Sequence, residues 1–184
     1  MVAESPLEPT EHGLAPTGRG WYVRNARDAP WYERDARGFY CEFEGLEGHD
    51  PDFSQLGINI TVLRRGEPMG MYHWEADQED FLVVAGEAIA IVEGEERPLR
   101  RWDLFHCPPG TEHTIVGAGE TPCVIVAVGA RDRSQGPDWG AYTVAEAALR
   151  HKAGVDDETT DRKQAYARFE ASRLTRYRDG LLEQ

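Results

Sequence analysis

The stretch between residues 57 and 131 alternates short apolar runs with turn-forming residues, and this pattern constrains the fold most. It opens with residues 57–64, Gly-Ile-Asn-Ile-Thr-Val-Leu-Arg, in which β-branched residues recur at every second position. Similar runs follow at 69–75, 81–85, 88–92, 104–107, 113–116 and 122–128, separated by turns rich in Gly, Pro and Asp. Many short strands with regular turns are typical of a sandwich or barrel. We therefore predict an all-β domain.

The flanks of this stretch have a different composition. Residues 1–18 are rich in Pro, Glu, Thr and Gly and lack periodic apolar positions, which predicts a disordered N-terminal lead-in. Aromatic residues then follow densely up to residue 43, which indicates short strands leading into the domain. We therefore place a barrel with N-terminal strands at residues 19–140.

Residues 141–184 predict a C-terminal helical extension that packs on the barrel or on a partner subunit. Thr143-Val-Ala-Glu146 is a capping-box sequence, and the helix it opens should stop near Gly154. A second helix is expected from Thr159 or Thr160 to about residue 169. Eight acidic and no basic residues lie between residues 75 and 96, whereas six Lys or Arg follow residue 159. This asymmetry favours docking of the C-terminal helix over the acidic sheet edge.

Charge and cysteine usage limit the class of protein. The formal net charge of −13 argues against binding to nucleic acid or to an anionic membrane, because both need clustered Lys and Arg. The N-terminus has no signal-peptide pattern, and no window approaches the run of about 20 apolar residues that spans a bilayer. The three cysteines show no C-x-x-C spacing, which favours a reducing, cytoplasmic location.

The candidate functional residues gather in two short segments. The first contains His73, Glu75 and Glu79, with six residues between Glu79 and Gly86. The second is Pro108-Pro-Gly-Thr-Glu-His113. Residues two apart on a strand share a face, so His73 and Glu75 should point the same way. Imidazole and carboxylate groups that converge in this manner are typical ligands of a divalent transition metal.

These two segments resemble the two motifs of the cupin family over roughly residues 57–130. The resemblance implies a double-stranded β-helix, also called a jelly-roll barrel, with one metal ion held by His73, Glu75, Glu79 and His113. Glu75 stands where the family usually has a second histidine, and Gly117 stands where the second motif usually ends in Asn. The donor set suits Fe, Mn, Ni or Zn and does not distinguish among them.

Glu75 has two possible roles, as a metal ligand or as the catalytic group that moves a proton to or from a bound substrate. Among the neighbouring residues, His106 and Cys107 are adjacent on a strand, so only one can face the cavity; a nucleophilic thiol and a buried structural Cys are the alternatives. Gln78 and Asp80 have the opposite parity to Glu79 and should face outwards or towards a partner. Two aromatic residues should serve packing, namely Tyr72 and Trp74.

The resemblance implies a metal-dependent enzyme acting on a small polar organic molecule, as a dioxygenase, decarboxylase, isomerase or lyase. A non-catalytic module that binds or senses a small molecule is the alternative, because the fold hosts both roles. A barrel that keeps the shape without metal is a third. Small cupins commonly pair through their sheets, so a homodimer is expected.

Overall fold

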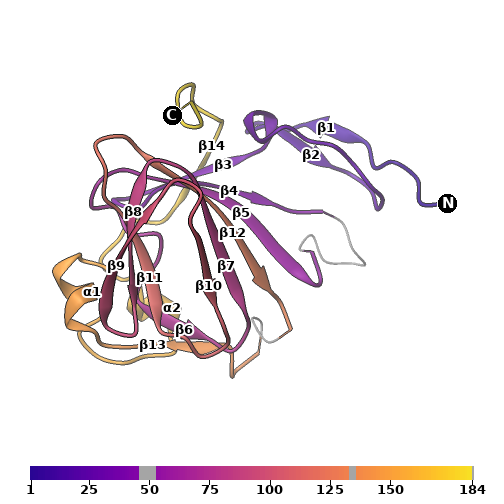
Figure 1. Cartoon of the computed structure of the whole chain (residues 1–184). Helices are drawn as coiled ribbons and strands as arrows, with labels where there is room; N and C mark the ends of the chain where they lie inside the picture. The colour runs from indigo at the N-terminus through magenta and orange to yellow at the C-terminus, as the bar shows by residue number, and fades with distance from the viewer. Residues whose placement is uncertain (46–52, 133–135, 184) are drawn as a thin grey trace.

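The computed structural model describes residues 1–45, 53–132 and 136–183. Two antiparallel sheets form its body (Figure 1). The all-β prediction is confirmed, with the double-sheet architecture of a jelly roll. None of the helices in the described ranges is long and apolar enough to cross a membrane.

The larger sheet has seven strands in the order β10-β7-β12-β5-β4-β3-β14. Its strands are β3 (Trp31–Arg34), β4 (Gly38–Phe43), β5 (Leu56–Leu63), β7 (Glu79–Ala85), β10 (Leu104–Cys107), β12 (Cys123–Ala130) and β14 (Arg173–Thr175). In β7 the alternate residues Phe81 and Val83 are buried in the cluster between the sheets, as expected for one inward face. Glu79 has the same parity, so its side chain also points between the sheets.

The smaller sheet has five strands in the order β13-β6-β11-β8-β9. They are β6 (His73–Glu75), β8 (Glu87–Val92), β9 (Glu95–Arg100), β11 (His113–Gly117) and β13 (Gly140–Tyr142). The sequence did not predict β9, because Glu-Glu-Arg-Pro-Leu-Arg has no apolar alternation. A strand at the edge of a sheet does not need apolar alternation. Pro98 is tolerated in β9 because an edge strand has no neighbouring strand on one side, so no hydrogen bond is required from it on that side.

The interior between the sheets is divided into an apolar part and a polar part. A cluster of buried apolar residues fills one part: Leu63, Phe81, Val83, Ala88, Cys107, Ile115, Cys123, Ile125 and Ala127. His73, Glu79 and His113 lie at the strand ends beyond this cluster, on the same inward faces. Burial of this cluster stabilises the fold through the hydrophobic effect, and the polar end opens to a cavity.

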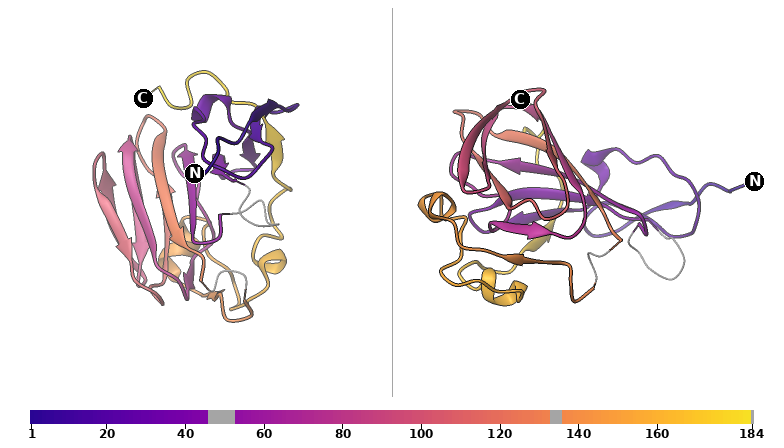
Figure 2. Two further views of the ribbon diagram at one scale, coloured as in Figure 1. Left: turned by 90° about the vertical axis from the view of Figure 1, so that its right-hand side faces the viewer. Right: turned by 60° about the horizontal axis from the view of Figure 1, so that its bottom comes forward.

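The N-terminal segment is structured where the sequence predicts a disordered lead-in. Within the first 18 residues, β1 (Leu7–Pro9) pairs with β2 (Leu14–Pro16) as a short hairpin. Figure 2 shows this segment extending away from the two sheets. The 3₁₀ turn η1 (Ala26–Asp28) follows, and Trp31 Nε1 donates to the carbonyl of Ala26 at 2.8 Å. Local pairing and caps therefore order a stretch that lacks apolar periodicity.

The C-terminal helices are shorter than the sequence predicts. Helix α1 (Glu146–Arg150) has Ala145 at its N-cap and no side-chain cap, so the expected capping box at Thr143 does not form. Its Ala147 and Ala148 are buried against the smaller sheet. Helix α2 (Arg162–Ala165) begins after Asp161, whose carboxylate accepts from the Lys163 N–H, and it ends well before residue 169.

The basic C-terminal residues contact a different acidic group from the expected one. Arg173 and Arg178 form ion pairs with Glu33 at 2.8 and 2.6 Å, because β14 pairs with β3 at the end of the larger sheet. The acidic run is instead contacted by α1 and the residue after it, since Arg150 and His151 both reach Glu96.

Candidate metal centre

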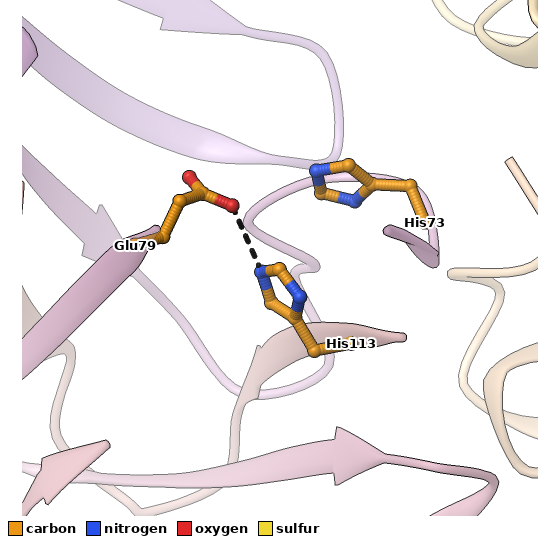
Figure 3. Close-up of side chains that lie close together, drawn as sticks. All are labelled: His73, Glu79 and His113. Carbon is orange, nitrogen blue, oxygen red and sulfur yellow. Dashed lines mark ion pairs between the residues drawn. The ribbon is translucent and has the colours of Figure 1, made fainter. Parts of the chain in front are cut away.

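Three of the predicted ligands converge at the polar end of the interior. His73 begins β6, Glu79 begins β7 and His113 begins β11, and one ligand atom from each lies within 4.8 Å of the others. His73 and His113 are directly paired across β6 and β11, which explains why their rings face each other with centroids 5.0 Å apart. Figure 3 shows Glu79 reaching the pair from the opposite sheet.

Each imidazole is oriented by a backbone carbonyl two residues earlier. His73 Nδ1 lies 2.7 Å from the Met71 carbonyl, and His113 Nδ1 lies 3.0 Å from that of Thr111. A carbonyl oxygen can only accept, so we assign the proton to Nδ1 in both rings. Nε2 of the neutral ring is then free to bind an ion, and this carbonyl contact is a usual support for metal-bound histidine.

Glu79 and His113 form a buried, oppositely charged pair. Glu79 Oε2 lies 3.2 Å from His113 Nε2, and the His113 side chain is only 3% exposed. Among the described residues no partner in hydrogen-bond geometry reaches Glu79 Oε2, although the atom is buried. A buried carboxylate oxygen needs a positive charge beside it: protonated His113 supplies one here, and a divalent ion bound by the two imidazoles would take its place. The donor set therefore fits a divalent metal.

The pKa values of the pair reflect its surroundings. Burial by itself would lower the pKa of His113, but the neighbouring Cys107 thiol and Glu79 carboxylate outweigh it and raise the pKa from 6.5 to about 10. For Glu79, burial acts to raise the pKa, and the His113 contact together with the charges of His73 and His113 lowers it overall. The protein without metal thus favours a protonated His113 beside an ionised Glu79.

Glu75 lies next to the three converging groups and not among them. Its Oε1 is 3.3 Å from His73 Nε2, and its side chain is 24% exposed. The group of ligand atoms within 4.8 Å of one another contains His73, Glu79 and His113 alone in the described part of the chain. Glu75 shares the face of His73, as the two-residue spacing predicts.

The neighbouring residues separate clearly by strand parity. His106 is half exposed and contacts Asp80 at 2.6 Å, whereas Cys107 is buried in the core. The Cys107 thiol packs in the apolar cluster and also lies beside the His113 ring, so the structural and the nucleophilic alternatives both stay predictions. Tyr72 is fully buried; its hydroxyl donates to Glu112 Oε2 and accepts from the Gly94 N–H, which confirms a packing role.

The Gly117 departure from the family motif has a steric reason. A Cβ atom at this position would lie 2.2 Å from the Arg64 carbonyl oxygen, so only glycine fits without moving the backbone.

A cavity of about 570 Å³ opens onto this centre. His73, Glu75 and Glu79 line it, together with several cationic and phenolic side chains: Arg34, Arg37, Arg131, Arg162, Tyr40, Tyr142 and Tyr166. Sequence reasoning missed the arginines, because residues 34–37 form a turn-like Arg-Asp-Ala-Arg whose position in space depends on the pairing of β3 and β4. Their spacing carries no functional signal by itself.

Comparison with known proteins agrees with this architecture. Residues 59–129 match the family model described as a cupin domain. The chain therefore carries a cupin domain, and its candidate centre falls within the matched residues. No curated protein matches the chain.

Several solved structures resemble the chain distantly. One is a protein provisionally named as a sugar phosphate isomerase from Acidithiobacillus ferrooxidans, with 20% identity and a TM-score of 0.44 over 51% of this chain and 60% of that one. A sugar phosphate isomerase of the cupin superfamily from Silicibacter pomeroyi shows 24% identity and a TM-score of 0.42 over 50% and 59%. KdgF from Halomonas sp. shows 23% identity and a TM-score of 0.41 over 52% and 82%.

The aligned part thus spans less than two thirds of the first two proteins. At these identities and TM-scores, the similarity to these structures says nothing about the activity or the substrate of this chain.

Proposed function

We propose that this chain is a metal-dependent cupin enzyme that acts on a small polar organic molecule. The observation that carries the proposal is the convergence of two oriented imidazoles and one buried carboxylate beside a cavity of about 570 Å³. A cavity of this size suits a small organic ligand. The reaction class stays open among dioxygenase, decarboxylase, isomerase and lyase.

His73, Glu79 and His113 would hold the ion. Two His and one carboxylate suit Fe, Mn, Ni or Zn. When bound, such an ion supplies Lewis acidity to an oxygen atom of the ligand. The carbonyls of Met71 and Thr111 would keep both rings oriented during the reaction, so the protein side of the site needs no rearrangement to present its donors.

Glu75 would move a proton. It lines the cavity beside His73 but stands apart from the three converging groups, and its partial exposure lets a ligand reach its carboxylate. An ionised carboxylate in this position can accept a proton from the ligand and return it at another atom. Glu75 stands where the family usually has a second histidine. In this proposal it is not needed to bind the ion, so it can act as a base.

The experiment that tests the proposal is elemental analysis of untagged protein purified without chelators. We expect about one transition-metal ion per chain, and loss of that ion in His73→Ala and in His113→Ala with the circular dichroism spectrum retained. His106→Ala is the matched control, because His106 pairs with Asp80 outside the converging group and should leave the metal content unchanged. Full metal content in both ligand variants would contradict the proposal.

Catalysis needs a separate assay. Oxygen uptake and product formation with the metal-loaded protein should reveal turnover of one member of a panel of organic acids and phenols. Tight reversible binding of one compound without any turnover would favour the non-catalytic binding module. The homodimer and the cytoplasmic location also stay predictions.

A further inference from the structure

Two arginines lie on the wall of the cavity formed by the N-terminal strands. Arg34 ends β3, and Arg37 stands just before the first residue of β4. The Arg37 N–H donates to the Arg34 carbonyl at 3.2 Å, which closes a tight turn between them. Both side chains line the same cavity as His73 and Glu79. The turn therefore brings two guanidinium groups to one side of the space.

Neither guanidinium has a carboxylate partner in residues 1–45, 53–132 and 136–183. Arg34 donates from Nη1 to the Met69 carbonyl at 3.0 Å, while its Nε and Nη2 are buried without a hydrogen-bond partner there. Arg37 is 9% exposed, and its buried Nε also lacks a hydrogen-bond partner among the residues that the structure describes. Arg131, on the same cavity, differs because it forms an ion pair with Glu42 at 3.2 Å.

The two charges are held in place by aromatic rings. The Arg34 guanidinium lies over Tyr40 at 4.8 Å, and that of Arg37 lies 4.6 Å from Tyr166 and 5.0 Å from Phe169. Ring faces orient a guanidinium and leave its N–H groups free to donate. Burial, followed by the nearby charge of Arg37, lowers the pKa of Arg34 to about 10, so the group stays cationic at neutral pH.

Keeping two unpaired cations next to each other is costly. Desolvation of an arginine and repulsion between like charges both oppose folding, and a carboxylate in the protein would have removed that cost. A ligand anion removes it as well, and the planar donor fork of arginine matches carboxylate and phosphate oxygens.

We propose that Arg34 and Arg37 form a subsite for the anionic group, carboxylate or phosphate, of the small molecule that occupies this cavity. The contact between the anionic group and the two arginines does not depend on the proposed function. The inference rests on the proposed function only where the other end of the molecule is said to approach His73 and Glu79. The anionic group at Arg34 and Arg37 would position the molecule with its reacting end beside Glu75. The substrate class is thus an organic acid or an organic phosphate.

The test compares charged and neutral probes of the same shape on the zinc-loaded full chain. Malonate, its neutral counterpart malonamide, and inorganic phosphate are titrated by isothermal calorimetry. The variants are Arg34→Met and Arg37→Met, and Arg65→Met is the matched control, since Arg65 is exposed and pairs with Glu120. His73→Ala provides a second background in which the metal site is damaged.

We expect the wild-type protein to bind malonate or phosphate at least about tenfold more tightly than malonamide. Arg34→Met and Arg37→Met should each lose about tenfold or more of the anion affinity at unchanged zinc content, and Arg65→Met should lose none. Whichever of malonate and phosphate binds more tightly identifies the anion source. Arginine-dependent anion binding that persists in His73→Ala supports the subsite even if the metal function fails.

Equal binding of malonate and malonamide by wild-type protein would overturn the proposal, and this comparison needs no variant to fold. Unchanged anion affinity in folded Arg34→Met and Arg37→Met would overturn it too. Should either Met variant unfold, Arg34→Lys and Arg37→Lys keep the charge without the planar fork. A clear loss of anion affinity in these variants supports the subsite, and wild-type affinity in both contradicts it.

Discussion

Two groups of residues at the cavity come from different parts of the chain. His73 and Glu79, with His113 buried beside them, belong to the cupin domain at residues 59–129, and strand parity places them. Arg34 and Arg37 belong to a turn upstream of that domain, and they reach the cavity only because β3 and β4 extend the larger sheet. If both proposals hold, the domain provides the metal site and the flanking turn selects the ligand.

The largest expected effect tests whether the N-terminal strands fold with the barrel. Trp31 is fully buried and lies 5.7 Å from the Tyr177 ring, so Trp31→Ala should lower the free energy of unfolding by about 3–5 kcal/mol. Urea denaturation followed by circular dichroism measures it. Trp21→Ala is the control, because Trp21 is 53% exposed and its removal should cost little. Two separate unfolding transitions in wild-type protein would show that the N-terminal strands and the barrel unfold independently.

The next effect compares the two carboxylates at the candidate metal centre, Glu79 and Glu75. Glu79→Gln keeps the shape of the side chain but removes the charge, so zinc affinity should fall at least about a hundredfold. Glu75→Gln should stay within about tenfold of the wild-type affinity, since Glu75 stands outside the converging group. Competition with a chelating dye measures both. A large loss in Glu75→Gln as well would make Glu75 a ligand.

The pH dependence of metal binding is expected to be smaller and of definite sign. His113 is protonated below its raised pKa of about 10, so binding must release that proton. Affinity for Mn²⁺ should therefore rise by about tenfold per pH unit at neutral pH and level off near the pKa of His113. Calorimetry in buffers of different ionisation enthalpy counts the protons. Binding without proton release would mean that His113 is not a ligand.

The smallest effect concerns the exposed ion pairs that join β14 to β3. Arg173 and Arg178 are 75% and 50% exposed where they contact Glu33, so Arg173→Ala and Arg178→Ala should each cost less than about 1 kcal/mol. Thermal unfolding at low and high salt checks this. A loss comparable to that of Trp31→Ala would indicate that charge, and not burial, attaches the C-terminal segment.

The sequence was most informative about the barrel. Period-two alternation located the strands around residues 57–64 and 122–128, and the motif spacing brought His73, Glu79 and His113 together. The same local signal failed for β9, because an exposed edge strand with Glu95, Glu96 and Arg97 needs no apolar face. Local patterns report which face of a strand is buried, and in β9 Leu99 alone packs against the core, which is too little to produce an alternation.

The position of Arg34 and Arg37 at the cavity was not predictable from the sequence, for a different reason. Arg34 and Arg37 are ordinary turn residues by composition, and their role depends on long-range pairing of β3 with β4 and on rings from the C-terminal segment. The expected helix lengths failed likewise, since Thr143 lies two residues before the actual N-cap of α1. Tertiary contacts decide such positions, and a linear pattern does not contain them.

The most direct measurement is anomalous diffraction at the zinc edge from crystals of the wild-type protein grown with Zn²⁺. The account predicts one anomalous peak bounded by His73, Glu79 and His113, about 2.0–2.1 Å from both Nε2 atoms. A zinc-saturated crystal with these three side chains in place and no peak between them would contradict it.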